Sequence, residues 1–353
     1  MKFSSRNMLV LMLLSCISLL MIECKPKKTA KDFSIDGGID SLQILAKGIF
    51  QALPAQADNP DNPITPEKIA LGKLLYFDTK LSMKGKNSCN SCHNLSTFGV
   101  DNEATSTGDD GLKGGRNSPT VLNAALNTTQ FWDGRAKDVE EQAGMPILNP
   151  VEMHMPNKAM LEDRLKKDAE YPKLFAAAFP NDKSPVKFEN LQKAIGAFER
   201  TLITPSKFDS YLEGKADALT QEEKDGLQLF VKTGCTTCHA GVNLGGQMFQ
   251  KFGLFGNYWD ATKSTKIDSG RITLTKQSGD LFMFRVPTLR NIAETKPYFH
   301  DGSIADLNDA IKIMSSLQLN KSLNDTEVKK IAAFLKTLSG NLPDDVKKDP
   351  FAR

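Results

Sequence analysis

Apolar positions recur with the spacing of an α-helix in several segments of the chain, and most of these segments have their own start signals. Thr65 precedes a proline at the first helical position and an apolar run that ends near residue 75. Thr220 and Glu223 form a capping-box pattern ahead of another run, as do Asn324 and Glu327. Further helices are predicted over residues 157–167, 185–202, 307–314 and 324–338.

A long unit of this pattern occurs twice. Pro-Thr-Val-Leu-Asn at 119–123 and Phe-Trp-Asp-Gly at 131–134 return as Pro-Thr-Leu-Arg-Asn at 287–291 and Phe-His-Asp-Gly at 299–302. Each position of the first copy recurs 168 residues later, which indicates an internal duplication. Strand patterns are few, and residues 270–275 are the best candidate. The sequence therefore predicts a mostly α fold of two domains, with a boundary near residues 203–218.

Composition narrows the class of protein. Lys and Arg together number 45 and Asp and Glu 42, so the net charge of +3 is nearly balanced and does not indicate nucleic-acid binding. About 330 residues follow the N-terminal segment, which is enough for two domains that each have a hydrophobic core.

The N-terminus carries the signals of an exported protein. Lys2 and Arg6 precede an apolar stretch at residues 8–22, which is short for a membrane span and typical of a signal peptide. Residues 1–24 are predicted to be a signal peptide and residues 25–40 a polar tether.

Two cysteines lie at the end of this leader or inside it. Cys16 follows a better lipobox sequence, whereas Cys24 is better placed after the apolar run. Either is a candidate for a lipidated N-terminal cysteine, which would tether the protein to a membrane, and a plain cleaved signal is the alternative.

Two Cys-x-x-Cys-His runs carry the main chemistry. In each, two thiols can form thioether bonds to a haem and the adjacent His can reach the iron as the proximal ligand. The residues concerned are Cys89, Cys92, His93, Cys235, Cys238 and His239. Zinc or two disulfides is the alternative, although a His fused to each pair is not a typical zinc spacing. Because c-type haem is attached outside the cytoplasm, these runs and the leader agree on a periplasmic location.

From about residue 64 to 340 the chain closely resembles the bacterial di-haem cytochrome c peroxidase family. The resemblance rests on both haem motifs, on both repeated segments and on Asn-Pro-Val-Glu-Met at 149–153. It implies two cytochrome-c-like haem domains, an N-terminal peroxidatic domain at 41–205 and a C-terminal electron-transfer domain at 206–353.

The family reduces hydrogen peroxide to water with electrons from a small cytochrome c or a cupredoxin. In that scheme electrons enter at the C-terminal haem and pass to the N-terminal haem. The family is commonly homodimeric. A non-enzymatic di-haem electron carrier and a MauG-like protein oxidase are the two rival interpretations.

The resemblance also implies roles for single residues. Glu152 matches the proton carrier, and its apolar neighbours would raise its pKa toward a useful value. Gln142 matches a second polar residue that orients peroxide, and Trp132 matches the aromatic between the two haems. Without the resemblance, these residues would be interpreted as a surface Glu, a helix-surface Gln and a core aromatic.

Met314 lies where the family places the thioether ligand of the second haem, and it separates the chain from MauG-type enzymes, which have Tyr there. By periodicity alone it would be a core Met. His300 occupies the position equivalent to Trp132 in the second copy, where a contact with a haem propionate or a packing role is expected. The resemblance further implies a calcium ion between the domains, bound by the Asn117 side chain and the carbonyls of Thr295 and Pro297.

One position departs from the family. Many members carry a distal His after the first haem motif, where this chain has Asp109 in a Gly- and Asp-rich loop. We expect that loop to be solvated and mobile. The first iron is therefore predicted to be five-coordinate or water-ligated when oxidised, and the enzyme to need no prior half-reduction. His154 is the alternative closing ligand.

Overall fold

The computed structural model describes residues 35–36 and 39–352. The predicted signal peptide, Cys16, Cys24 and most of the predicted tether lie outside these residues. No helix within the described ranges is both long and apolar enough to cross a membrane.

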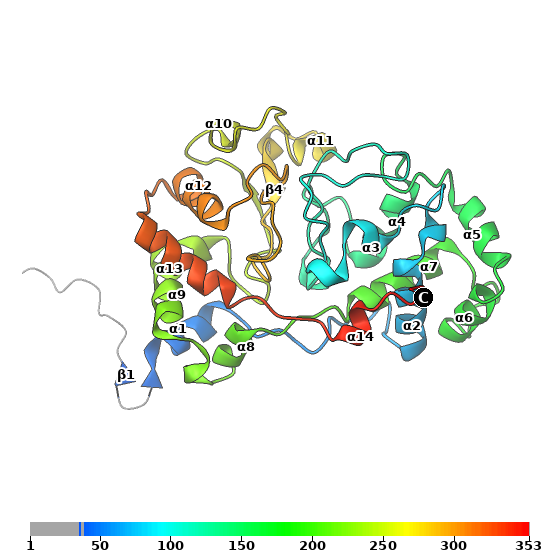
Figure 1. The fold of residues 1–353 in the computed structure, drawn as a ribbon, viewed down its shortest axis with the longest axis horizontal. Coiled ribbons are helices and arrows are strands. Elements are labelled where there is room, and N and C mark those ends of the chain that lie inside the picture. The colour runs from blue at the N-terminus through cyan, green and yellow to red at the C-terminus, as the bar shows by residue number, and fades with distance from the viewer. Residues whose placement is uncertain (1–34, 37–38, 353) are drawn as a thin grey trace, which may run out of the picture.

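Helices form two lobes, and two short antiparallel strand pairs complete the fold (Figure 1). The first lobe contains α2 (Pro66–Phe77), α3 (Cys89–Cys92), α4 (Val139–Leu148), α5 (Lys158–Lys166), α6 (Tyr171–Ala178) and α7 (Phe188–Glu199). The second contains α8 (Lys207–Leu212), α9 (Gln221–Thr233), α10 (Tyr258–Thr262), α11 (Ile272–Thr275), α12 (Leu307–Leu319) and α13 (Asp325–Lys336). The remaining elements are α1 (Ser41–Ile49), α14 (Asp344–Lys347), β1 (Ile35–Asp36), β2 (Ile39–Asp40), β3 (Phe249–Lys251) and β4 (Met283–Arg285).

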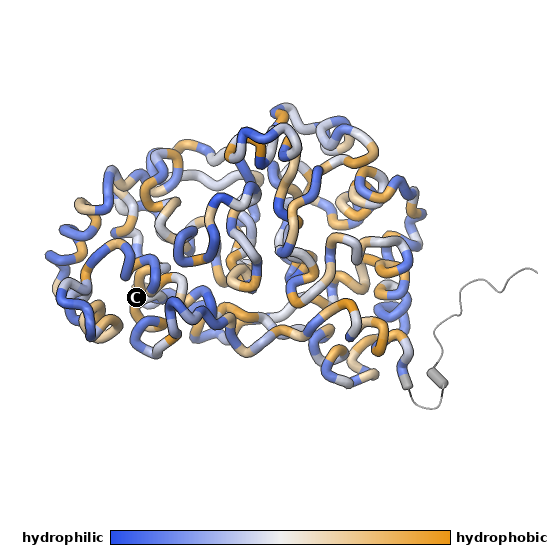
Figure 2. Tube along the Cα trace, turned by 180° about the vertical axis from the view of Figure 1, so that it is seen from behind, coloured by the Kyte–Doolittle hydropathy of each residue, from blue (hydrophilic) through white to orange (hydrophobic). Residues whose placement is uncertain are grey.

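The start signals in the sequence are helix caps in the structure. The Thr65 side chain accepts a hydrogen bond from the backbone of Lys68, and Thr220 and Asn324 both form complete capping boxes. Each cap satisfies backbone N–H groups that a helix start otherwise leaves without partners. Hydrophobic and hydrophilic stretches follow one another along the helices of both lobes (Figure 2), and α9 and α13 each bury the apolar positions of one face.

Each lobe is built on one tightly packed pair of helices. In the first lobe, α2 crosses α7 at Gly72, where an added Cβ would lie 1.9 Å from the carbonyl oxygen of Ala194. In the second lobe, α9 crosses α13 at Gly226, where an added Cβ would lie 2.0 Å from the carbonyl oxygen of Lys330. Glycine is therefore required at both crossings, and the two lobes share one architecture. The prediction of two related helical domains is confirmed.

The repeated loops also share their backbone conformation at equivalent positions. Asn123 and Asn291 both have a positive φ, of 59° and 61°. Their side chains donate hydrogen bonds to the same hydroxyl, that of Thr204, at 2.8 and 2.9 Å. The duplicated segments therefore meet at the chain that joins the two lobes.

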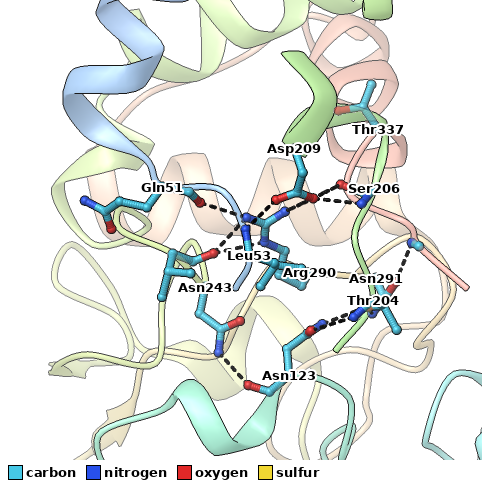
Figure 3. A network of polar contacts seen from close by, with 12 residues as sticks. Gln51, Leu53, Asn123, Thr204, Ser206, Asp209, Asn243, Arg290, Asn291 and Thr337 are labelled. Carbon is cyan, nitrogen blue, oxygen red and sulfur yellow. Dashed lines mark hydrogen bonds and ion pairs between the residues drawn. The ribbon is translucent and has the colours of Figure 1, made fainter. Parts of the chain in front are cut away.

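A buried ion pair lies beside this junction (Figure 3). Arg290 is fully buried and its Nη1 donates to the Asp209 carboxylate at 2.7 Å. The same carboxylate accepts from the backbone of Leu53 and of Ser206 at 2.8 Å each. Since every partner is present, the pair fixes the start of α8 against the second repeated loop.

The two ends of the described chain pack on the lobe that is distant in sequence. Leu42, Ala46 and Phe50, in and next to α1, belong to the hydrophobic core of the second lobe. Leu342 belongs to the core of the first lobe, and Val346 in α14 packs against it. Each lobe is therefore completed by a segment from the opposite end of the chain (Figure 1).

The strand prediction at residues 270–275 is wrong. After a turn at Gly270, which has a φ of +71°, residues 272–275 form the short helix α11. The backbone N–H groups of Thr275 and Lys276 donate to Arg271 and Ile272 at 3.1 and 2.9 Å. Local hydrogen bonds therefore override the preference of Ile and Thr for strands.

Candidate active site and haem cavities

A large cavity opens within the second lobe and reaches the junction with the first. Its lining includes all residues of the second Cys-x-x-Cys-His run that were predicted to hold haem, together with Met314 of α12. His239 points its Nδ1 at the carbonyl oxygen of Leu244, 3.0 Å away. That contact places the proton on Nδ1 and leaves Nε2 free to bind a metal. The donor set fits a haem held by two thioethers and an axial His and Met.

Four predicted residues of the domain junction line the same cavity: Asn117, Trp132, Thr295 and Pro297. The indole N–H of Trp132 donates to the carbonyl oxygen of Asn117 at 2.9 Å. The Asn117 side-chain amide donates to the carbonyl of Glu103 at 3.0 Å, so its oxygen is left for another partner. The structure thus brings the predicted relay residue and the predicted calcium ligands to one wall.

His300 lies in the aromatic part of that wall. Its ring stacks on Phe284 at 4.2 Å between centroids and meets Tyr258 and Trp132 edge-on. It is 2% exposed, and its Nε2 has no hydrogen-bond partner among the described residues. Burial lowers the pKa of His300, so a neutral ring is favoured.

The first haem motif forms the short helix α3, and His93 is its C-cap. The His93 backbone N–H donates to Cys89 at 2.9 Å, and its carbonyl accepts from the Tyr76 hydroxyl of α2 at 2.5 Å. Burial lowers the pKa of His93, which keeps the imidazole neutral and able to bind a metal. Tyr76 was not predicted from the sequence, because it appears there as one more apolar position of α2.

The four motif cysteines are free thiols. Burial raises the pKa of each of them, that of Cys235 to about 12. No cluster of three His, Cys, Asp or Glu side chains with metal-binding geometry occurs within the described residues.

Glu152 lies close to the first haem motif. Burial raises the pKa of Glu152, against the opposing effects of the Arg135 charge and the Asn149 amide, which donates to Oε1 at 2.9 Å. The Glu152 charge in turn contributes to the raised pKa of Cys92, where burial is the main cause. A carboxyl whose pKa is raised, and which lies beside a predicted haem attachment site, is suited to accept a proton and to return it.

Gln142 projects from α4, the helix that leads into the Glu152 turn. It is half-buried, and its side-chain amide makes no hydrogen bond to any described residue. The amide is therefore available to a ligand.

The loop at Asp109 differs from the expectation of a solvated segment. Asp109 is 1% exposed, and its carboxylate accepts from the Ser82 hydroxyl and from the backbone of Lys84 and Lys86 at 2.9, 2.5 and 3.0 Å. Burial acts to raise the pKa of Asp109, but these donors bring it below its ordinary value. The prediction of a solvated loop is wrong for Asp109, because the Ser82–Lys86 turn supplies the partners that bury its carboxylate. Thr107, Gly111 and Leu112 of the same loop are exposed, as expected.

The same loop is hydrogen-bonded to the turn that carries Glu152. The Asp109 backbone N–H donates to the Glu152 carbonyl at 2.7 Å. Asp110 pairs with the Nδ1 of His154 and with the Lys84 ammonium. His154 is therefore paired with Asp110, and this contact holds the loop beside Glu152.

The comparisons with known proteins agree with this geometry. The family described as di-haem cytochrome c peroxidase matches residues 66–217, and the family described as cytochrome c matches residues 223–339. Cytochrome c551 peroxidase of Pseudomonas aeruginosa is 46% identical over 306 residues, or 86% of this chain and 88% of the relative. The cytochrome c551 peroxidase of Nitrosomonas europaea is 47% identical over 314 residues, or 87% of this chain and 92% of the relative.

A solved structure shows the same fold. It is that of a MauG-like protein associated with microbial copper homeostasis. The TM-score is 0.76 at 32% sequence identity, and the match covers 85% of this chain and 98% of that chain.

Two related helical lobes, each with a Cys-x-x-Cys-His run, define a di-haem c-type cytochrome. The relatives narrow this class, and the chain belongs to the di-haem cytochrome c peroxidase family. It is an oxidoreductase, a cytochrome c peroxidase that carries two c-type haems. The sequence prediction of the family, the mostly α fold and the enzyme class is confirmed.

Proposed function

We propose that the chain reduces hydrogen peroxide to water at the N-terminal haem, with electrons that enter at the C-terminal haem. The observation that carries this proposal is the half-buried Glu152, whose raised pKa and position near Cys92 suit a proton carrier. The relatives of Pseudomonas and Nitrosomonas are named cytochrome c551 peroxidases, which supports the same chemistry.

The reaction needs two electrons and two protons for each peroxide and yields two waters. The bound N-terminal haem supplies an open iron position and the electrons. Glu152 takes the proton from one peroxide oxygen and returns it to the other as the O–O bond breaks. Gln142 orients the peroxide with a neutral amide, which does not compete for that proton. His93 holds the proximal side.

The C-terminal site is proposed to be closed by His239 and Met314. A thioether ligand raises the reduction potential of a haem, which suits a site that accepts electrons from a donor. Trp132 lies on the wall of that cavity and is proposed as the relay toward the N-terminal haem. Met314 also favours peroxidase over MauG-like protein oxidation.

A calcium ion is proposed at the junction, with the Asn117 side chain and the carbonyls of Thr295 and Pro297 as ligands. All three residues line one cavity, and oxygen ligands suit this hard cation. The ion would hold the first repeated loop of one domain against the second domain.

We further propose an N-terminal peroxidatic domain at 41–205 and a C-terminal electron-transfer domain at 206–353. The chain is proposed to act in the periplasm, as a homodimer, with a small cytochrome c or a cupredoxin as donor. The apolar leader supports export, and Cys16 and Cys24 are the residues through which lipid could tether the protein.

Peroxide turnover by the holoprotein, with a reduced small cytochrome as donor, tests the proposal. Stoichiometric oxidation of two donor molecules for each peroxide supports it. A protein that exchanges electrons with the donor yet does not consume peroxide would be the non-enzymatic carrier instead.

A further inference from the structure

Arg285 is a buried cation that has no anionic partner among the residues that the structure describes. It ends β4, is 3% exposed, and lines the C-terminal haem cavity. Its backbone N–H donates to Trp132 at 2.8 Å and its Nε donates to the carbonyl of Phe131 at 3.1 Å. A second nitrogen of the guanidinium, Nη1, is buried and has no hydrogen-bond partner within the described residues.

The other two buried arginines of the described chain each pair with a carboxylate. Arg290 pairs with Asp209 at 2.7 Å, and Arg200 pairs with Glu140 through two contacts of 2.7 Å. Arg285 has carbonyl oxygen as its protein acceptor and no carboxylate. Burial alone lowers the pKa of Arg285 to about 10, and no nearby anion offsets that effect.

An unpaired charge at this depth is costly unless a bound group neutralises it. The cavity that Arg285 lines also holds Cys235, Cys238, His239 and Met314, the residues that hold the C-terminal haem. A haem carries two propionate carboxylates. A second buried polar atom on the same wall, the Nε2 of His300, also has no hydrogen-bond partner among the described residues. The His300 ring stacks on Phe284, the residue that precedes Arg285 in the chain.

We propose that Arg285 binds a propionate of the C-terminal haem through Nη1. The same guanidinium and backbone then join that propionate to the carbonyls of Phe131 and Trp132, in the first repeated loop. A charge-assisted bond of this kind is geometrically specific, which suits a contact that must hold a cofactor across a domain junction. The fixed positive charge also favours the ferrous state of that haem, because the ferric core carries one more positive charge.

Replacing Arg285 with Gln tests this role by a measurement other than activity. Redox titration of the holoprotein should show a lower potential for the C-terminal haem, by about 59 mV, which is a tenfold change in the ferric-to-ferrous ratio of a one-electron couple. The N-terminal haem should shift less. Replacement by Lys keeps the charge and should recover most of the shift.

Arg271→Gln is the matched control. Arg271 lies beside β4, with its backbone N–H donating to Met283 at 2.8 Å. Its guanidinium donates to the Asp133 carbonyl at 2.5 Å and lies 3.7 Å from the Asp280 carboxylate, but it does not line the cavity. Replacing Arg271 removes the same charge. At a fixed potential, the ferric-to-ferrous ratio of the C-terminal haem should then stay within about twofold of the wild-type ratio. An unchanged potential in Arg285→Gln, or equal shifts in both variants, would overturn the proposal.

A structure of the wild-type holoprotein provides a test that does not depend on a variant folding. The proposal requires Nη1 of Arg285 within about 3.2 Å of a propionate oxygen of the C-terminal haem. A guanidinium that instead bonds a protein carbonyl or solvent, with both propionates held elsewhere, contradicts it.

Discussion

Glu152→Gln is the substitution that probes the proposed chemistry most directly. The glutamine has the same shape, and its Oε1 can still accept from the Asn149 amide, a contact of 2.9 Å in the wild type. The backbone contact between Asp109 and the Glu152 carbonyl is untouched. The change therefore removes the exchangeable proton and the charge while it leaves the turn in place. Both haems and their spectra should be retained.

The expected loss follows from the role of a positioned acid/base. Such a group contributes about 10²–10⁴-fold to a rate, which corresponds to roughly 3–5 kcal/mol in the activation free energy. The assay is steady-state oxidation of a reduced small cytochrome by peroxide. The kcat should fall by this factor, whereas transfer of electrons to the C-terminal haem should be unchanged, because that haem lies in the other lobe.

The pH profile separates a proton carrier from a merely structural residue. Burial raises the pKa of Glu152 above its ordinary value, so the ionised form that accepts the first proton is lost as the pH falls through that raised pKa. Wild-type activity should therefore fall on the acid side, and Glu152→Gln should lack that limb. Glu103→Gln, which changes an exposed carboxylate of the same lobe, is the control. Near-normal turnover in Glu152→Gln would remove Glu152 from the mechanism.

Three further predictions address the other sites. Met314→His should lower the potential of the C-terminal haem, because imidazole stabilises ferric iron more than a thioether does, and a redox titration without any shift would exclude Met314 as the ligand. The oxidised wild type should show a five-coordinate or water-ligated N-terminal haem in its optical spectrum and should turn over without prior reduction; a purely low-spin, inactive sample would point to closure by His154. Asp209→Asn should destabilise the fold by about 3–5 kcal/mol, because it leaves the buried Arg290 without its anion; an unchanged urea midpoint would refute the importance of that pair.

Local signals in the sequence predicted the helical framework well. The caps at Thr65, Thr220 and Asn324 depend on side chains within four residues of the helix start, so the sequence contains all the information they need. The repeat could be recognised for the same reason. Its structural counterpart is the pair Asn123 and Asn291, which share one backbone conformation and one hydroxyl partner.

Contacts between segments that are distant in the sequence could not be predicted from such local signals. Nothing in the pattern of α1 shows that Leu42 packs in the second lobe, because an apolar helix face does not specify the surface that covers it. Glu199 is another example. It appears as the polar end of α7, yet burial raises its pKa to about 8, with a further contribution from the Glu140 charge. Arg285 similarly resembles any strand residue until the cavity beside it is known.

The loop at Asp109 shows how a local rule can mislead at a functional site. Glycine and aspartate indicate exposed turns because their side chains are short and polar. Here the Asp109 carboxylate is buried by three donors from the Ser82–Lys86 turn, and its backbone N–H reaches the Glu152 carbonyl. A loop held on both sides supports the proposed proton carrier and has little freedom to deliver a closing ligand. The prediction of an N-terminal iron that is open when oxidised therefore rests on the buried anchor at Asp109, and not on the mobile loop that the sequence suggested.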